Sequence, residues 1–494
     1  MEGGSKVCLL CLVIETAADS RGGAGRIEPP RLTIDTLPDE MLLEVFDCHR
    51  LLTLGSASSG LWEWHRLAHV CRRWRTIVFS SPQRLDLRLV YTYDNPLRES
   101  ADCWPSLPIS IWYPPTQRLA PGDEGNVVAA LGYPDRICEI NLTMTRSVLA
   151  KSFSLLRASF PALERLYLRS QDSMRSLILP TAFLGGAAPR LRDIHLDSTA
   201  FPMLPQVLLS AHELVSLQLE NIPNSGYVSP DSLANSLSAT TRLEYLGIFF
   251  LPPMPHPNQR STASPPHAIL PALTNFQFKG EIDYLGDLVT KLDAPALERL
   301  AVSLFEESSF DISQLIQFVG RTQTFRSPHR TSIELSETEF TITHDFQPSS
   351  TSFSPGNVKL RVSYDEADQQ MLTLVHICRQ LSALLATPEC LDIVASPDLF
   401  AWRGPSEADS MRWVELFRHF LGVKRLGLSS ELAAIVASAF EQVTETSDTL
   451  PSLREIHMSG SRPATLSSIE RFAADRERSG YLVSVHYQSG EVDT

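Results

Sequence analysis

Apolar residues near the start of the chain recur at the spacing of a helix. The four that do so are Met41, Leu42, Val45 and Phe46. Steps of three and four residues place them on one helix face. Pro38 suits the first helical turn, where a missing N–H costs nothing. The pattern therefore predicts an amphipathic helix that begins near Pro38.

A second amphipathic helix is expected from about Leu61 to Ser80, after the Gly- and Ser-rich segment 55–60, which is typical of a loop. Its arginines, at 72, 73 and 75, are expected to form a solvated face. Its apolar side carries Trp64, Leu67, Ala68, Cys71, Trp74 and Val78. A core of roughly 50 residues is marginal, so surplus apolar surface should be covered by later segments or by a partner. Trp74 is alternatively an ordinary core residue.

Beyond this region one pattern recurs: apolar-x-x-apolar-x-apolar. It occurs at Ile137-Ile140-Leu142, Leu163-Leu166-Leu168, Leu191-Ile194-Leu196, Leu214-Leu217-Leu219, Leu243-Leu246-Ile248, Leu273-Phe276-Phe278, Leu297-Leu300-Val302, Val423-Leu426-Leu428 and Leu453-Ile456-Met458. By subtraction, the first seven starts lie 26, 28, 23, 29, 30 and 24 residues apart. Each triplet predicts a short strand, and the residues between predict a helix or loop that returns across the other face.

Several details complete this prediction. Alternating leucines at 85–91 predict a strand that leaves the helical region, and 481–487 predicts a terminal capping strand. Prolines two residues before five triplets suit strand entrances. Weaker strands are expected near Ile333, at 358–362 and at 391–393, with helices at 369–386 and 411–421. Residues 251–270 predict a Pro-rich surface insertion.

The N-terminal residues resemble the F-box family. The resemblance rests on Leu-Pro-Asp-Glu at 37–40, Val-Phe at 45–46, Val-Cys-Arg-Arg-Trp-Arg at 70–75 and Ile-Val at 77–78. The wider sequence resembles F-box proteins of mushroom-forming fungi. Leu37 and Trp74 stand 37 positions apart, roughly ten more than in a compact F-box, with the extra residues in the segment 51–60. A surface loop of that size is tolerable.

The later repeats resemble leucine-rich repeats, although the Asn that usually follows each strand is not repeated here. The resemblance implies an α/β repeat fold: an irregular solenoid with parallel strands on one face and helices or loops on the other. We predict a disordered leader at 1–32, an F-box domain at 33–82, the solenoid at 83–487 and a tail at 488–494. A compact α/β domain of another kind is the alternative.

The F-box resemblance implies a substrate receptor of an SCF-type ubiquitin ligase. Its helices would dock on a Skp-family adaptor, and through it a cullin scaffold, while the solenoid binds an unknown protein target. The predicted adaptor-binding residues are Leu37, Pro38, Leu42, Val45, Phe46, Val70, Cys71, Trp74 and Ile77. Polar replacements of Val45, Phe46 and Trp74 are expected to abolish that binding. The alternative is an interaction scaffold that does not direct ubiquitin transfer.

Composition narrows the remaining classes of function. The formal net charge of −14 disfavours nucleic acid as a partner. Eight cysteines over 494 residues fit reduced thiols in the cytoplasm or nucleus. No stretch is long and apolar enough to span a membrane. Phosphate-loop, nucleophile-elbow and zinc-protease motifs are missing, so we predict no catalytic residue, no cofactor and no metal.

Overall fold

The computed structural model describes most of the chain between residues 34 and 488. The described ranges are 34–53, 63–82, 84–91, 107–113, 123–172, 177–254, 267–305, 310–346, 356–364, 367–395, 407–441, 449–459 and 466–488. The predicted leader at 1–32, the loop at 55–60, most of the Pro-rich insertion and most of the tail lie outside these ranges. Contacts divide the chain into two compact units, one of residues 1–144 with 160–163, the other of residues 145–159 with 164–494.

The first unit consists of helices followed by a small parallel sheet. Its elements are α2 (Asp39–Thr53), α3 (Glu63–Val70), α4 (Arg72–Ser80), β1 (Leu89–Tyr91), β2 (Ile109–Tyr113), α6 (Asp123–Leu131) and β3 (Ile137–Met144). β1 pairs with β2, and β2 with β3, both in parallel. The predicted strand at 85–91 is wrong for its first half, because Asp86 adopts a left-handed conformation (φ 49°) in a turn at 84–86 and β1 begins only at Leu89.

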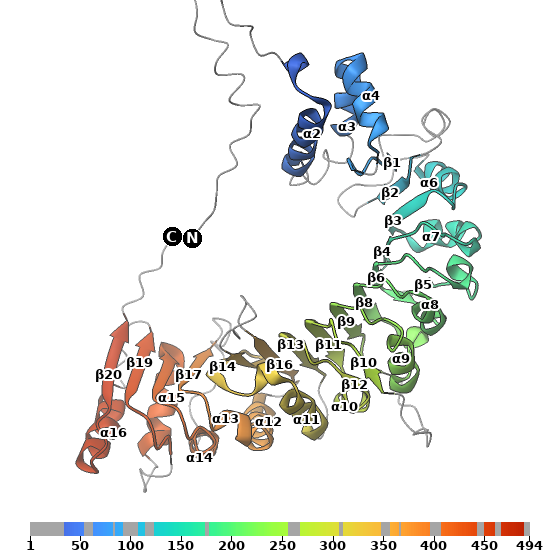
Figure 1. The fold of residues 1–494 in the computed structure, drawn as a ribbon. Coiled ribbons are helices and arrows are strands. Elements are labelled where there is room, and N and C mark those ends of the chain that lie inside the picture. The colour runs from blue at the N-terminus through green and yellow to red at the C-terminus, as the bar shows by residue number, and fades with distance from the viewer. Residues whose placement is uncertain are drawn as a thin grey trace, which may run out of the picture. The chain divides into compact units, whose positions relative to one another are not determined.

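The second unit has one long sheet with helices on one of its faces (Figure 1). The sheet's strands are β4 (Arg165–Ser170), β6 (Asp193–Asp197), β8 (Ser216–Ile222), β9 (Tyr245–Phe250), β11 (Asn275–Gly280), β13 (Arg299–Leu304), β14 (Pro328–Leu335), β15 (Glu339–Phe346), β16 (Asn357–Ser363), β17 (Cys390–Ala395), β18 (Arg425–Ser429), β19 (Glu455–Ser459) and β20 (Ser484–Gln488). Two short parallel pairs lie outside it: β5 (Leu177–Ile178) with β7 (Thr199–Ala200), and β10 (Ala268–Ile269) with β12 (Leu292–Asp293).

Helices connect most of the later strands of this sheet. They are α7 (Arg146–Ser152), α8 (Leu204–Ser210), α9 (Pro230–Leu237), α10 (Ile282–Val289), α11 (Ser313–Arg321), α12 (Ala367–Gln380), α13 (Ser382–Leu385), α14 (Glu407–Phe417), α15 (Ser430–Glu441) and α16 (Leu466–Arg478). Successive helices pack against one another, as α8 does with α9 and α14 with α15. The α10 and α15 helices lie between predicted strands, where the sequence predicted a helix or loop without deciding between them.

The predicted triplets become buried strand positions in register. Leu166, Ile194, Leu217, Leu246, Phe276 and Leu300 are direct partners on successive parallel strands, and all are buried. Because alternate residues of a strand point to opposite faces, one row of apolar side chains lines the helix side of the sheet. The triplet spacing therefore predicted these strands correctly.

The prolines before the triplets have a different role from the one predicted. Each lies at the second position of a tight turn that ends at the first triplet leucine, rather than at a strand entrance. Leu163 N–H donates to Phe160 O at 3.1 Å across Pro161, and Leu297 N–H donates to Ala294 O at 3.2 Å across Pro295. The fixed φ of proline favours that position of a β-turn. The repeats at Pro189, Pro271 and Pro451 have the same turn.

A hairpin interrupts the parallel order in the middle of the sheet. The strand order there is β13-β16-β15-β14-β17, and β15 pairs antiparallel with both β16 and β14. The strands predicted near Ile333, 358–362 and 391–393 are present as β14, β16 and β17. The antiparallel β15 was not predicted, so a wholly parallel strand face is wrong at this point.

Candidate functional site: the exposed surface of the N-terminal helices

The three N-terminal helices share a small core. Phe46 of α2 and Trp74 of α4 are only 1% and 8% exposed, and their ring centroids lie 4.8 Å apart. Leu42 and Ile77 are also buried. Tilted aromatic pairs at this distance stabilise a core beyond the area that they bury. The chain's own helices therefore cover these four side chains.

The second predicted helix is broken in two. Cys71 has an extended backbone, and its Sγ accepts a hydrogen bond from the Trp74 N–H at 3.4 Å, so it caps α4. The prediction of one helix from 61 to 80 is thus wrong at residue 71, although its apolar spacing holds on both sides. The break lets α3 and α4 pack against each other. The side chain of Trp64 lies outside the described residues.

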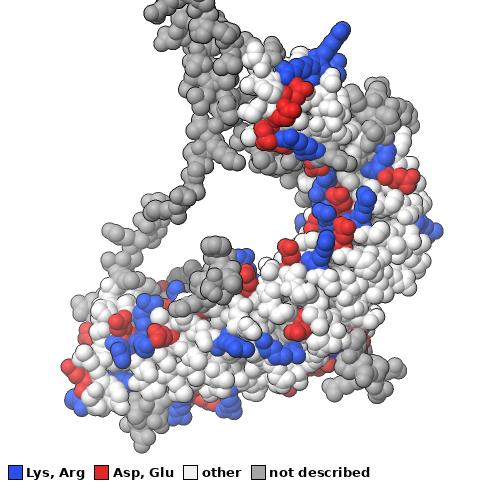
Figure 2. All heavy atoms as spheres, viewed as in Figure 1, with Lys and Arg blue, Asp and Glu red and all other residues white. Residues whose placement is uncertain are grey.

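Two arginines of the expected solvated face, one exposed and one half-buried, also connect the helices. The Arg73 guanidinium donates to Leu37 O at 2.5 Å and to Asp39 Oδ1 at 2.6 Å, which holds the start of α2 against the start of α4. Arg75 Nε donates to Ala68 O at 3.0 Å and so connects α4 to α3. Basic and acidic side chains lie beside one another on this part of the chain (Figure 2).

Apolar surface remains exposed outside the core. Val70, at the end of α3, is 60% exposed, and Met41 of α2 is 42% exposed. Met41 and Val45 share one face of α2, and Pro38, just before the helix, stands three residues ahead of Met41 on the same side. Val70 lies three residues before Arg73, the residue that binds the start of α2. An apolar surface of this kind marks a protein-interaction site when it is continuous.

The structure divides the nine predicted adaptor-binding residues by exposure. Four are buried in the core and, in the folded state, can support an interface but not form its surface: Leu42, Phe46, Trp74 and Ile77. Leu37, Val45 and Cys71 are half-buried, whereas Pro38 and Val70 are exposed. Met41 belongs with the exposed group but was not among the nine. Its spacing from Pro38 and Val45 was the signal in the sequence that could have identified it.

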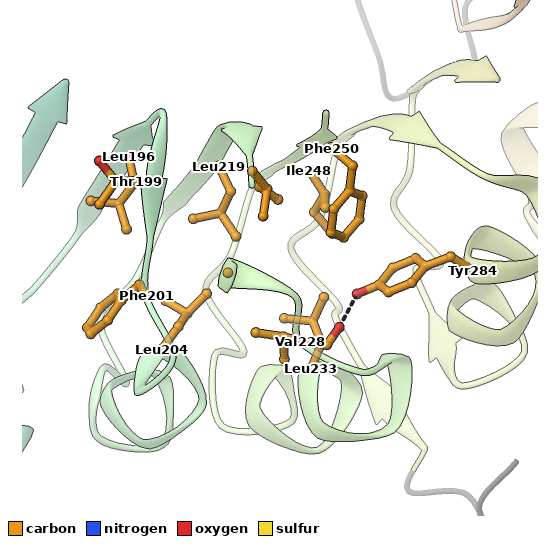
Figure 3. A pocket seen from close by; sticks show the side chains of 12 residues that line it. Leu196, Thr199, Phe201, Leu204, Leu219, Val228, Leu233, Ile248, Phe250 and Tyr284 are labelled. Carbon is orange, nitrogen blue, oxygen red and sulfur yellow. Dashed lines mark hydrogen bonds between the residues drawn. The ribbon is translucent and has the colours of Figure 1, made fainter. Parts of the chain in front are cut away.

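An apolar gap under the first strands of the second unit is too small for a ligand. A gap between β6, β8 and β9 and the helices below them has a volume of about 20 Å³ (Figure 3). Its lining is mainly apolar, and Tyr284 Oη donates to Val228 O at 2.8 Å. Such a volume holds about one water molecule. We therefore interpret the gap as imperfect packing.

The described ranges contain no group of three or more His, Cys, Asp or Glu side chains that could hold a metal ion. No helix in them has the length and apolar character needed to cross a membrane.

Comparison with known proteins supports the N-terminal part of the sequence prediction. Residues 34–86 match the family described as F-box-like, so the chain carries an F-box-like domain there. No curated protein matches the chain. A solved structure, the leucine-rich repeat-containing protein LegL7 from Legionella pneumophila, is 10% identical with a TM-score of 0.27, over 78% of this chain and 98% of that chain. The resemblance to fungal proteins stays a prediction.

Proposed function

We propose that this chain is the substrate-receptor subunit of an SCF-type ubiquitin ligase. In this proposal the F-box-like helices dock on a Skp-family adaptor and, through it, on a cullin scaffold. The long sheet and its helices form an irregular leucine-rich-repeat solenoid that holds a protein target. The chain has no catalytic site of its own, and ubiquitin transfer follows from proximity to other subunits.

One observation carries the proposal. The described part of the residues that match the F-box-like family includes three helices with a buried core, yet Met41 and Val70 stay exposed. Large apolar side chains that a small domain leaves uncovered are typical anchors for a partner. The free thiols of Cys48, Cys138 and Cys378 favour a reducing compartment, so we place the protein in the cytoplasm or nucleus.

Co-expression with a Skp-family adaptor tests the docking step. The wild-type chain should co-purify with the adaptor, and the double variant Met41→Asp/Val70→Asp should not, because two carboxylates would be desolvated in the interface. The matched control is Met411→Asp/Val128→Asp, which changes the same residue types at exposed helical positions elsewhere. Equal co-purification of both double variants would contradict the docking surface.

A second measurement separates a ligase receptor from an interaction scaffold. Proteins trapped on the wild-type chain while the proteasome is blocked would be quantified after the block is lifted. A receptor predicts that such a target accumulates in cells that carry Met41→Asp/Val70→Asp. A target whose level does not change would favour the scaffold alternative.

A further inference from the structure

The face of the long sheet opposite the helices, called here the open face, has an unusual charge distribution in its middle. β11, β13 and β16 are neighbours in the sheet, and none of them contains Asp or Glu. They contribute four cations to the open face: Lys279, Arg299, Lys359 and Arg361. Figure 2 shows basic side chains in a row over this part of the sheet. A local excess of positive charge contrasts with the net charge of −14 of the whole chain.

The register places these cations around two small residues. Ala301 of β13 is the direct partner of Lys359, and Ser303 is the direct partner of both Arg361 and Lys279. Neighbouring strands lie about 4.8 Å apart, and Lys279 and Arg361 stand on the two strands beside Ser303. Their backbones are therefore roughly 10 Å from each other. Arg299 precedes Ala301 by two residues on the same strand. Ala301 and Ser303 therefore form a low floor with cations around it.

The far side of the floor is also small and polar. Thr343 and Thr341 of β15 are the register partners of Lys359 and Arg361; Thr343 is half-buried and Thr341 is buried, and Glu339 and Asp345 flank them on the same face of β15. The hydroxyl groups of Thr343 and Ser303, which are half-buried, suit an anion beside these cations, because they add hydrogen-bond donors to the charge attraction. No bulky apolar residue among these partners competes for the space.

Internal partners compensate the charge only in part. Arg361 pairs with Glu339 at 3.4 Å, but the two side chains are 41% and 33% exposed, so solvent screens the pair. The Lys279 ammonium lies 6.0 Å from the centroid of the Phe305 ring. The aromatic ring attracts the ammonium but does not neutralise its charge. Arg299 and Lys359 form no ion pair with any residue that the structure describes.

We infer that this surface binds an acidic, extended segment of the target protein, with the anionic side chains over Ala301 and Ser303. The inference rests on the proposed function and names the chemistry of its target. Lys359 and Arg361 are two residues apart on one strand, about 6.7 Å, which equals the repeat of side chains on one side of an extended peptide. The chain's net charge disfavours a long nucleic acid at the same place.

Fluorescence polarisation with the full chain, measured alone and in the presence of a Skp-family adaptor, tests the inference. The probes are a labelled ten-residue peptide of alternating Glu and Ser, the same peptide with each Ser phosphorylated, a version with Lys in place of Glu, and a 20-nucleotide single-stranded DNA. We expect the acidic peptides to bind, more weakly as salt rises, and the Lys peptide not to bind. Tighter binding of the phosphorylated peptide would assign phosphoryl groups as the preferred anions, and equal binding would assign carboxylates.

Two variants locate the site. Lys359→Gln/Arg361→Gln should weaken binding at least tenfold, and Ser303→Asp should weaken it similarly without the loss of a cation. The control, Lys151→Gln/Arg190→Gln, removes one exposed Lys and one exposed Arg elsewhere in the same unit and should bind as the wild type. Unchanged affinity in both site variants, binding of neither acidic peptide, or tighter binding of the DNA would each overturn the inference.

The outcome is separable from that of the proposed function. The site variants keep the F-box-like helices intact, so adaptor co-purification should persist in all of them. If a site variant loses peptide binding but still binds the adaptor, the defect is confined to the open face. Peptide binding by a chain that never binds the adaptor would refute the ligase proposal and leave this surface in place.

Discussion

The division between core and surface in the F-box-like helices makes a quantitative prediction for Phe46→Ala. Phe46 is buried to 1% exposure and its ring packs on Trp74 with centroids 4.8 Å apart. Truncation of a buried Phe to Ala costs about 3–5 kcal/mol, and the aromatic pair contributes part of that loss. Small domains have about 5–15 kcal/mol of stability in total. A core of this size rarely supplies more than about 3–5 kcal/mol, so the variant should lose most of the stability of the three helices.

Urea unfolding, monitored by hydrogen exchange of the peptides that cover α2 and α4, measures this loss. The control is Met41→Ala on the same helix, where exposure predicts a change within about 0.5 kcal/mol. Phe46→Ala should lower the unfolding free energy, and any loss of adaptor binding should follow from that unfolding. Met41→Ala should weaken adaptor binding while the unfolding free energy stays close to that of the wild type. The reasoning would be refuted if Phe46→Ala abolished adaptor binding while the unfolding free energy changed by less than about 1 kcal/mol.

Further predictions concern single side chains. Burial lowers the pKa of His344 from 6.5 to about 4, so the unfolded chain binds this proton first as the pH falls. Stability should fall by about 3 kcal/mol from pH 6.5 to 4 relative to His344→Gln, and parallel pH profiles of urea unfolding would contradict this. Asp197 is buried and accepts from Asn221 at 2.8 Å. Asp197→Ala should cost about 1–3 kcal/mol in the same assay, and a change below 0.5 would contradict it. Arg73→Ala should cost at most about 1 kcal/mol, because its ion pair with Asp39 is exposed; a loss above 2 would show stronger coupling.

The repeat spacing was sufficient to locate most strands because each strand buries the same positions. Leu166 and Leu246 occupy equivalent register positions on their strands, so an apolar residue recurs at that position along the sequence. The strand β15 was missed although Phe340, Ile342, His344 and Phe346 alternate and are buried. Its alternation does not fit the triplet pattern, and pairing direction depends on partners that are distant in sequence.

The N-terminal site shows a different limit. Helical spacing placed Phe46 and Trp74 on apolar helix faces. It did not show whether another helix of the chain or an outside partner covers them. That choice depends on the break at Cys71, where a thiol caps α4, and on the contacts of Arg73 with Leu37 and Asp39. The two Arg73 contacts join residues about 35 positions apart. No local pattern in the sequence specifies them.

Hydrogen exchange of the wild-type chain with and without a purified Skp-family adaptor tests the central claim most directly. The adaptor should protect backbone amides at 37–48 and 69–75, the segments that carry Met41 and Val70, and leave the open face around Lys359 unchanged. Protection confined to strands β4–β20, or no protection at saturating adaptor, would contradict the account.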